Sequence, residues 1–340
     1  MALAVFALRK AIWFAIQVLL GVAMLAVLLY FADIGKVVSA ISQADILYLA
    51  MATFAFISAS VVVGYSLYVL LERMGYSPSA LRTVLVSIAG QLVSDITPAR
   101  TGYFVTPLIM SGQLGVTLED GMAAIVFTGA VQAFASVVLG AIAILYFSRL
   151  IASGLEVVLL AVIGLVPVAL MGLGLFSLIH HSWLNWLLHS IREVPFVKPR
   201  LEQIRQAIST FQKSGRRATS AAVQVIFFLL VAQGLNSVAL YLLSLSVGIH
   251  GLTVFDCVMT YSIAGFTMYA FLTVAGLGVQ ESMYVILLGL LKASVEKATA
   301  VAMMARFFFT VTDLIGLPEL TKMGVRTTIR ALSNGQSTPA

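Results

Sequence analysis

Long apolar runs recur along the chain from residue 11 onward. Six of them are long enough to cross a hydrocarbon layer about 30 Å thick as continuous helices. These runs cover residues 11–31, 46–71, 121–147, 155–179, 222–247 and 299–318. The pattern predicts an all-α fold, a polytopic transmembrane bundle with six full spans.

Two further apolar stretches, residues 84–112 and 255–291, are interrupted in the middle. Proline and clustered glycines free backbone groups that lipid cannot satisfy, so such breaks persist only inside protein or beside water. The interruptions read Asp95-Ile96-Thr97-Pro98-Ala99-Arg100-Thr101-Gly102 and Val274-Ala275-Gly276-Leu277-Gly278. We interpret both stretches as re-entrant hairpins made of broken helices.

The distribution of basic residues agrees with six spans and two hairpins. This topology places 14 of the 20 Lys and Arg residues on the cytoplasmic side, seven of them in a loop between residues 192 and 217. Counting residues 84–112 as one full span would move that loop outside, which the positive-inside rule rejects. We therefore expect a multi-pass protein of the cell membrane with both termini in the cytoplasm.

The order span, span, hairpin, span occurs twice with opposite orientation, which is typical of inverted-repeat transporters. At an offset of 176 residues, 46–71 falls on 222–247, and Thr97 and Gly102 fall on Thr273 and Gly278. We expect a single integral membrane domain over 1–340. Its predicted parts are a first repeat at 1–150, an inverted second repeat at 151–325 that includes a cytoplasmic basic loop at 180–220, and a disordered tail at 333–340.

The composition excludes a water-soluble fold. The 340 residues are 61% hydrophobic and only 10% charged, with a mean hydropathy of +1.04, whereas soluble domains carry about 25% charged residues. Apolar runs occupy the whole length and leave no room for a soluble catalytic domain. Cys257 is the only cysteine, which excludes an internal disulfide and a cysteine metal cage.

The basic loop has two local features. Residues 199–215 place apolar side chains at helical spacing opposite Lys and Arg; this predicts either a helix on the cytoplasmic membrane surface or a solvated connector helix. His180, His181 and His189 lie next to tryptophans, without cysteine or acidic ligands at metal spacing. An interfacial aromatic belt is the better interpretation of these histidines.

Charged residues inside a membrane are costly unless they are paired or hydrated, so they are candidates for function. Arg100 is the foremost candidate. It stands in a Pro/Gly break where half-helix ends expose backbone N–H groups, and a guanidinium binds phosphate in a bidentate fork. The alternative is that Arg100 pairs with Asp95 or Glu281 and holds the hairpins together.

The second break is followed by Glu281, near the start of a half-helix, where the helix dipole stabilises a carboxylate. Glu281 has three possible roles: proton acceptor, counter-charge for a cationic headgroup, or ion-pair partner of Arg306. Arg306 and Asp313 are seven residues apart and hence lie on one helical face. Asp313 is expected to be a hydrated residue at the end of its span.

The sequence carries no familiar catalytic motif. It lacks HExxH, Walker A and nucleophile-elbow patterns, and Gly276 and Gly278 are not followed by the third glycine of a dinucleotide fingerprint. We therefore expect no enzyme activity, no catalytic residues, no metal, no cofactor and no nucleic-acid partner.

The two broken motifs, together with Arg306 in the last span, resemble the transmembrane region of lysylphosphatidylglycerol synthases and its free-standing, flippase-like relatives. The resemblance implies a lipid-translocating unit without the aminoacyl-transferase domain that the best-known members carry. Two positions depart from the family pattern. Tyr103 stands where an acidic residue is frequent, and Val274-Ala275-Gly276 stands where Pro-Gly-Gly is frequent, so the substrate headgroup is expected to differ.

The leading hypothesis is a flippase-like transporter for an anionic lipid or a polyprenyl- or dolichyl-linked substrate, with a separate synthase or glycosyltransferase as a possible partner. The alternative is an integral membrane enzyme or accessory subunit that modifies lipid-linked glycan or phospholipid without transport. The predicted substrate-binding residues are Asp95, Thr97, Pro98, Arg100, Gly102, Gly276, Gly278, Glu281 and Arg306.

Overall fold

The computed structural model describes residues 2–97, 100–150, 218–267, 273–274 and 276–322. All elements in these ranges are helices, which confirms the all-α class. They are α1 (Ala2–Phe31), α2 (Ile34–Ser42), α3 (Ile46–Arg73), α4 (Ala80–Asp95), η1 (Thr101–Val105), α5 (Thr106–Gln113), α6 (Leu118–Ser148), η3 (Thr219–Ala221), α10 (Ala222–Ser246), α11 (Val254–Thr267), α12 (Val279–Leu290), α13 (Val295–Asp313) and η4 (Leu314–Gly316).

Four of the predicted spans are long, apolar helices. They are α3, α6, α10 and the stretch Val295–Lys322 that begins with α13. The predicted first span is α1, which bends by 85° into α2 and can count with it as a fifth span. The predicted span at 155–179 and the tail at 333–340 lie outside the described residues. The same holds for residues 180–217 of the predicted basic loop at 180–220, which include its amphipathic helix and histidines.

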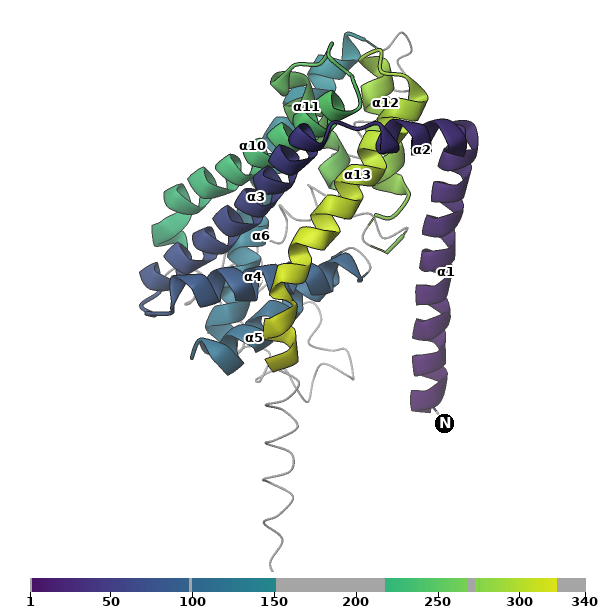
Figure 1. Cartoon of the computed structure of the whole chain (residues 1–340). Coiled ribbons are helices and arrows are strands. Elements are labelled where there is room, and N and C mark those ends of the chain that lie inside the picture. Colours follow the sequence, from purple (N-terminus) through teal and green to yellow (C-terminus); the bar gives the residue numbers. More distant parts are fainter. Residues whose placement is uncertain (1, 98–99, 151–217, 268–272, 275, 323–340) are drawn as a thin grey trace, which may run out of the picture.

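The sharp bend between α1 and α2 has a local cause. Asp33 adopts a left-handed backbone conformation, with φ 58°, and its carboxylate accepts a hydrogen bond of 3.1 Å from the backbone N–H of Gly35. An Asp tolerates this conformation better than most residues and caps the helix that follows. As a result α2 runs from the upper end of α1 toward α13, at a steep angle to α1 (Figure 1).

Helices α3 and α10 pack side by side in opposite directions (Figure 1). The backbone N–H of Asp45, just before α3, donates to the carbonyl of Ser246 at the end of α10 over 2.9 Å. Farther along the pair, the rings of Tyr65 and Phe228 meet edge to face with centroids 5.2 Å apart. Contacts at both places fix the relative register of the two helices.

The order of elements is the same on both sides of residues 151–217. A long helix is followed by a short helix, a break, another short helix and another long helix. The first set is α3, α4, α5 and α6, starting at Ile46, Ala80, Thr106 and Leu118, and the second is α10, α11, α12 and α13, starting at Ala222, Val254, Val279 and Val295. Corresponding helices therefore start close to the predicted offset of 176 residues.

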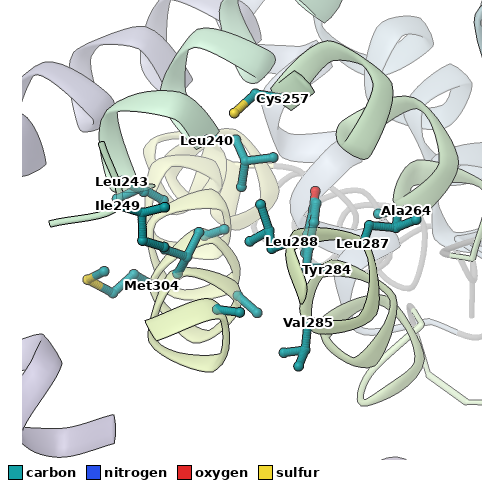
Figure 2. Packing of buried hydrophobic residues seen from close by; sticks show 14 of the residues in the cluster. Leu240, Leu243, Ile249, Cys257, Ala264, Tyr284, Val285, Leu287, Leu288 and Met304 are labelled. Atoms are coloured by element: carbon teal, nitrogen blue, oxygen red, sulfur yellow. The ribbon is translucent and has the colours of Figure 1, made fainter. Parts of the chain in front are cut away.

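Side chains sort by environment as a membrane bundle requires. The larger buried cluster gathers around α10 to α13 and includes Leu240, Leu287 and Leu288 (Figure 2). Large apolar side chains on the outside remain exposed, such as Phe54 at 73% and Val223 at 81%. A surface of this kind suits contact with lipid tails, because lipid imposes no cost on exposed hydrocarbon.

Candidate functional site

In the first break, the Thr97 side chain links the end of α4 to the residues that follow the break. Its hydroxyl donates to the carbonyl of Ser94 over 3.1 Å and accepts from the backbone N–H of Gly102 over 2.7 Å. A Cβ at Gly102 would lie 2.5 Å from the carbonyl oxygen of Val93, so no side chain fits there. This explains the Thr and Gly of the motif; the predicted site residue Pro98 lies outside the described residues.

Arg100 follows in a left-handed conformation, with φ 57°, that turns its side chain back toward α4. Its Nη2 donates to Oδ1 of Asp95 over 2.8 Å, and its guanidinium carbon lies 5.3 Å from the ring centroid of Phe309 on α13. The Asp95 side chain is 2% exposed, whereas that of Arg100 is 15% exposed. The pairing that sequence analysis gave as the alternative role of Arg100 is therefore present, with the arginine on the accessible side.

Asp313 also belongs to this region, and the expectation that it would be a hydrated end residue is wrong. It is 0% exposed, and its carboxyl lies among Asp95, Arg100 and Ser60. The reason is that the chain continues through η4 as far as Lys322, and α4 packs against this continuation. At Gly316 the backbones are so close that a Cβ would lie 2.3 Å from the backbone nitrogen of Ala89.

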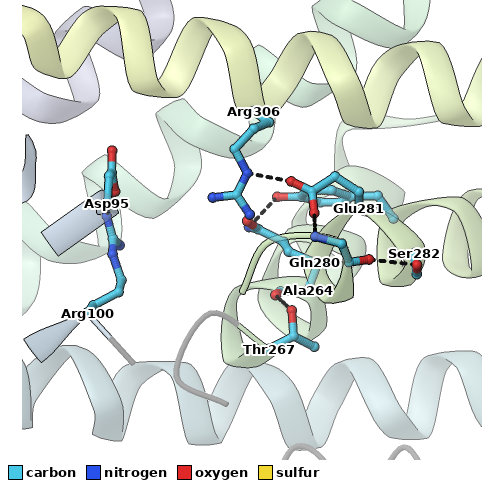
Figure 3. A network of polar contacts seen from close by, with 10 residues as sticks. Asp95, Arg100, Ala264, Thr267, Gln280, Glu281, Ser282 and Arg306 are labelled. Atoms are coloured by element: carbon cyan, nitrogen blue, oxygen red, sulfur yellow. Dashed lines mark hydrogen bonds and ion pairs between the residues drawn. The ribbon is translucent and has the colours of Figure 1, made fainter. Parts of the chain in front are cut away.

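The second break leads into α12 through Gly278, whose φ of 79° suits a glycine. Glu281 uses both carboxylate oxygens. Oε2 accepts from the backbone N–H of Gly278 over 2.7 Å, and Oε1 accepts from Nε of Arg306. Figure 3 shows this network beside the pair Asp95 and Arg100. The predicted place of Glu281 and its partnership with Arg306 are both confirmed.

The two ion pairs expose the same kind of group. Glu281 is 1% exposed at its side chain and Arg306 16%, which repeats the pattern of Asp95 and Arg100. In both pairs the carboxylate is sealed in the protein and the guanidinium keeps some accessible surface. At either break, the accessible surface of the ion pair therefore comes mainly from the guanidinium.

Helix α1 packs directly on the second break. A Cβ at Gly278 would lie 2.6 Å from Cβ of Met24 and 2.7 Å from the carbonyl oxygen of Gly21. The predicted site residue Gly276 also has a positive φ, of 72°. Both glycines thus serve backbone geometry, and Gly278 additionally allows α1 to touch the break.

A small hollow lies next to the second break. Its lining residues are Phe56, Tyr261, Gln280, Glu281, Tyr284, Ala302, Ala305, Arg306 and Phe309. Arg100 is absent from this lining, but it stacks on Phe309, so a single aromatic ring connects the first break to the hollow. The structure thus brings the two breaks to one region without joining their ion pairs.

A second small hollow shares Tyr261 with the first. Uncharged polar side chains line it between α6 and α10, namely Gln132, Ser136, Gln233 and Asn236. Sequence analysis missed these residues because it followed charges only. Amide side chains inside otherwise apolar spans were the available sequence feature, since polar groups within lipid-spanning helices seek polar surroundings.

The described residues contain no group of three His, Cys, Asp or Glu side chains placed to hold a metal ion.

The family model for the lysylphosphatidylglycerol synthase TM region matches residues 14–316. The chain belongs to this family. The matched range contains both breaks, Arg306 and Asp313, and it confirms the resemblance drawn from the motifs. A comparison with curated proteins found no match. With its long apolar helices, the chain is a multi-pass membrane protein.

Proposed function

We propose that the protein is a flippase-like transporter that translocates an anionic lipid or lipid-linked substrate between membrane leaflets, without a chemical step of its own. The observation that carries the proposal is the shared asymmetry of the two ion pairs, in which the buried member is the acid and the accessible member is the arginine. Guanidinium groups bind phosphate oxygens in bidentate geometry, and burial strengthens such bonds.

The position of the hollows supports transport. Irregular backbone at membrane depth persists where protein or a hydrated cavity surrounds it, and transporter sites lie at broken helices between structural repeats. Arg306 lines one hollow directly, and Tyr261 lines both this hollow and the polar one. A headgroup would bind here while its hydrocarbon tails remain in the bilayer.

The repeated order of elements supports an inverted repeat with two re-entrant hairpins. Helices α3 and α10 are antiparallel partners, and each is followed by one broken segment. Rocking of one half against the other would expose the hollows alternately to the two leaflets. A separate synthase or glycosyltransferase would then supply or consume the transported lipid.

The proposal is tested by the rate at which fluorescently labelled phosphatidylglycerol changes leaflet in proteoliposomes, followed by quenching of the outer leaflet. We expect Arg100→Gln and Arg306→Gln to lower the rate at least tenfold. Arg82→Gln is the matched control, because Arg82 is an exposed arginine on α4, away from the break. Labelled phosphatidylcholine and a polyprenyl phosphate define the headgroup preference.

The outcome that contradicts the proposal is equal transport by Arg100→Gln, Arg306→Gln and Arg82→Gln, each eluting as the folded protein in size-exclusion chromatography. Empty liposomes and liposomes with heat-unfolded protein set the background rate.

A further inference from the structure

The ends of α4 and α13, which pack against each other, bring two carboxyl groups together inside the protein. Asp95 is the last residue of α4 and Asp313 the last of α13. The side chain of Asp95 is 2% exposed, and Asp313 is 0% exposed. The close backbone approach of Gly316 to Ala89 holds the two helix ends together, so the carboxyls cannot move apart without separating the helices.

The hydrogen bonds of this pair are incomplete. Oδ1 of Asp95 accepts from Arg100, but Oδ2 of Asp95 and both oxygens of Asp313 are buried and accept no hydrogen bond from any described residue. Buried carboxylate oxygens without donors carry a large desolvation cost. A proton shared between the two acids removes this cost, because it cancels one charge and supplies a donor.

Nearby charges do not balance the second carboxylate. Among the elements packed against α13, Glu281 on α12 is engaged with Arg306, and Lys36 on α2 lies near Glu296 at the opposite end of α13. On α3, Ser60 is the polar residue beside Asp313, while Glu72 and Arg73 are about 18 Å farther along the helix. Arg82 is about 20 Å away along α4. One guanidinium therefore faces two acids.

We infer that Asp95 and Asp313 hold one proton between them, and that the pair takes up a second proton when an anion binds the guanidinium of Arg100. The uptake of a second proton on anion binding rests on the proposed function. An anion on Arg100 competes with Asp95 for the same donors, so Asp95 loses its counter-charge. Beside a second buried acid it becomes neutral by binding a proton from water, because two buried groups of like charge disfavour ionisation.

Charge balance makes this a proton-coupled anion site. The resting cluster contains one arginine and two carboxylates that share one proton, and is neutral. The occupied cluster contains the anion on arginine and two protonated acids, and is neutral again. One proton therefore enters with each singly charged anion, and a transmembrane pH difference of one unit would support a tenfold lipid gradient.

The first experiment measures the carbonyl stretch of protonated carboxyl groups by infrared spectroscopy of the reconstituted protein near neutral pH. We expect a band that shifts in D₂O and is lost in Asp313→Asn, with Glu296→Gln as the control that removes an acid from the other end of α13. A spectrum without the band, or a band unchanged in Asp313→Asn, overturns the shared proton.

The second experiment measures proton uptake from a weakly buffered solution when short-chain phosphatidylglycerol is added to the protein in detergent. We expect about one proton per bound lipid for the parent protein and Glu296→Gln, and none for Arg100→Gln. Binding of lipid without uptake overturns the coupling while leaving the proposed transport intact. A carboxyl band in a protein that moves no lipid supports the shared proton and overturns the transporter.

Discussion

The two breaks are built from the same kinds of charge but differ in how completely those charges are satisfied. At the second break, one acid meets one arginine, and both oxygens of Glu281 have donors. At the first break, two acids face one arginine, and three of the four carboxyl oxygens have no donor among the described residues. The charges of the second break are therefore held in one arrangement, a fixed break. The carboxyl groups of the first break can instead change hydrogen-bond partners and bind protons, which makes it an exchangeable break.

Loss of the Glu281–Arg306 pair is expected to lower the free energy of unfolding more than any other change considered. Arg306→Met leaves a carboxylate that is 1% exposed without its cation, and breaking a buried pair costs about 3–5 kcal/mol. Equilibrium unfolding in mixed micelles measures this. The matched change at the first break, Arg100→Met, should cost less because Asp95 can then become neutral by protonation. Equal losses would remove the distinction between a fixed and an exchangeable break.

The double variant Glu281→Gln/Arg306→Met sharpens the same point. It removes both charges, so most of the stability lost in Arg306→Met should return. A double variant as unstable as Arg306→Met would show that the packing of the arginine stem, not its charge, holds the second break.

Gly278→Ala should have the next largest effect. The residue has φ 79°, and its Cβ would lie 2.6 Å from Cβ of Met24. Backbone strain and overpacking together should cost about 2–4 kcal/mol in the free energy of unfolding. Gly289→Ala, in the helix α12 that follows Gly278, is the control, because nothing lies within 4 Å of its added Cβ. Protease cleavage between α1 and α2 should also become faster only in Gly278→Ala.

The smallest expected effect belongs to the first break. Thr97→Val leaves the buried N–H of Gly102 without its acceptor, at a cost of about 1–2 kcal/mol. Thr299→Val is the control, because that hydroxyl donates only to Val295, one turn earlier in α13. A loss in Thr97→Val no larger than in Thr299→Val would show that the loop does not depend on this bond.

Apolar run lengths were sufficient to predict α3, α6, α10 and the stretch that begins with α13, because span length depends on the hydrocarbon thickness alone. Proline and clustered glycines located both breaks, because the backbone requirements of a break depend on local sequence. Asp313 was misjudged because its burial depends on α4, more than 200 residues earlier in the chain. Likewise, Gln132 and Asn236 line the same hollow only because α6 packs beside α10, which local sequence does not reveal.

The spacing between Arg306 and Asp313 links the two breaks mechanically. Seven residues make almost two helical turns, so one face of α13 presents the partner of Glu281 and, about 10 Å away, the neighbour of Asp95. Inserting or deleting one residue between them would rotate one group by about 100° away from its counterpart. Natural variants of this protein should therefore tolerate changes of side chain along this segment far better than any change in its length.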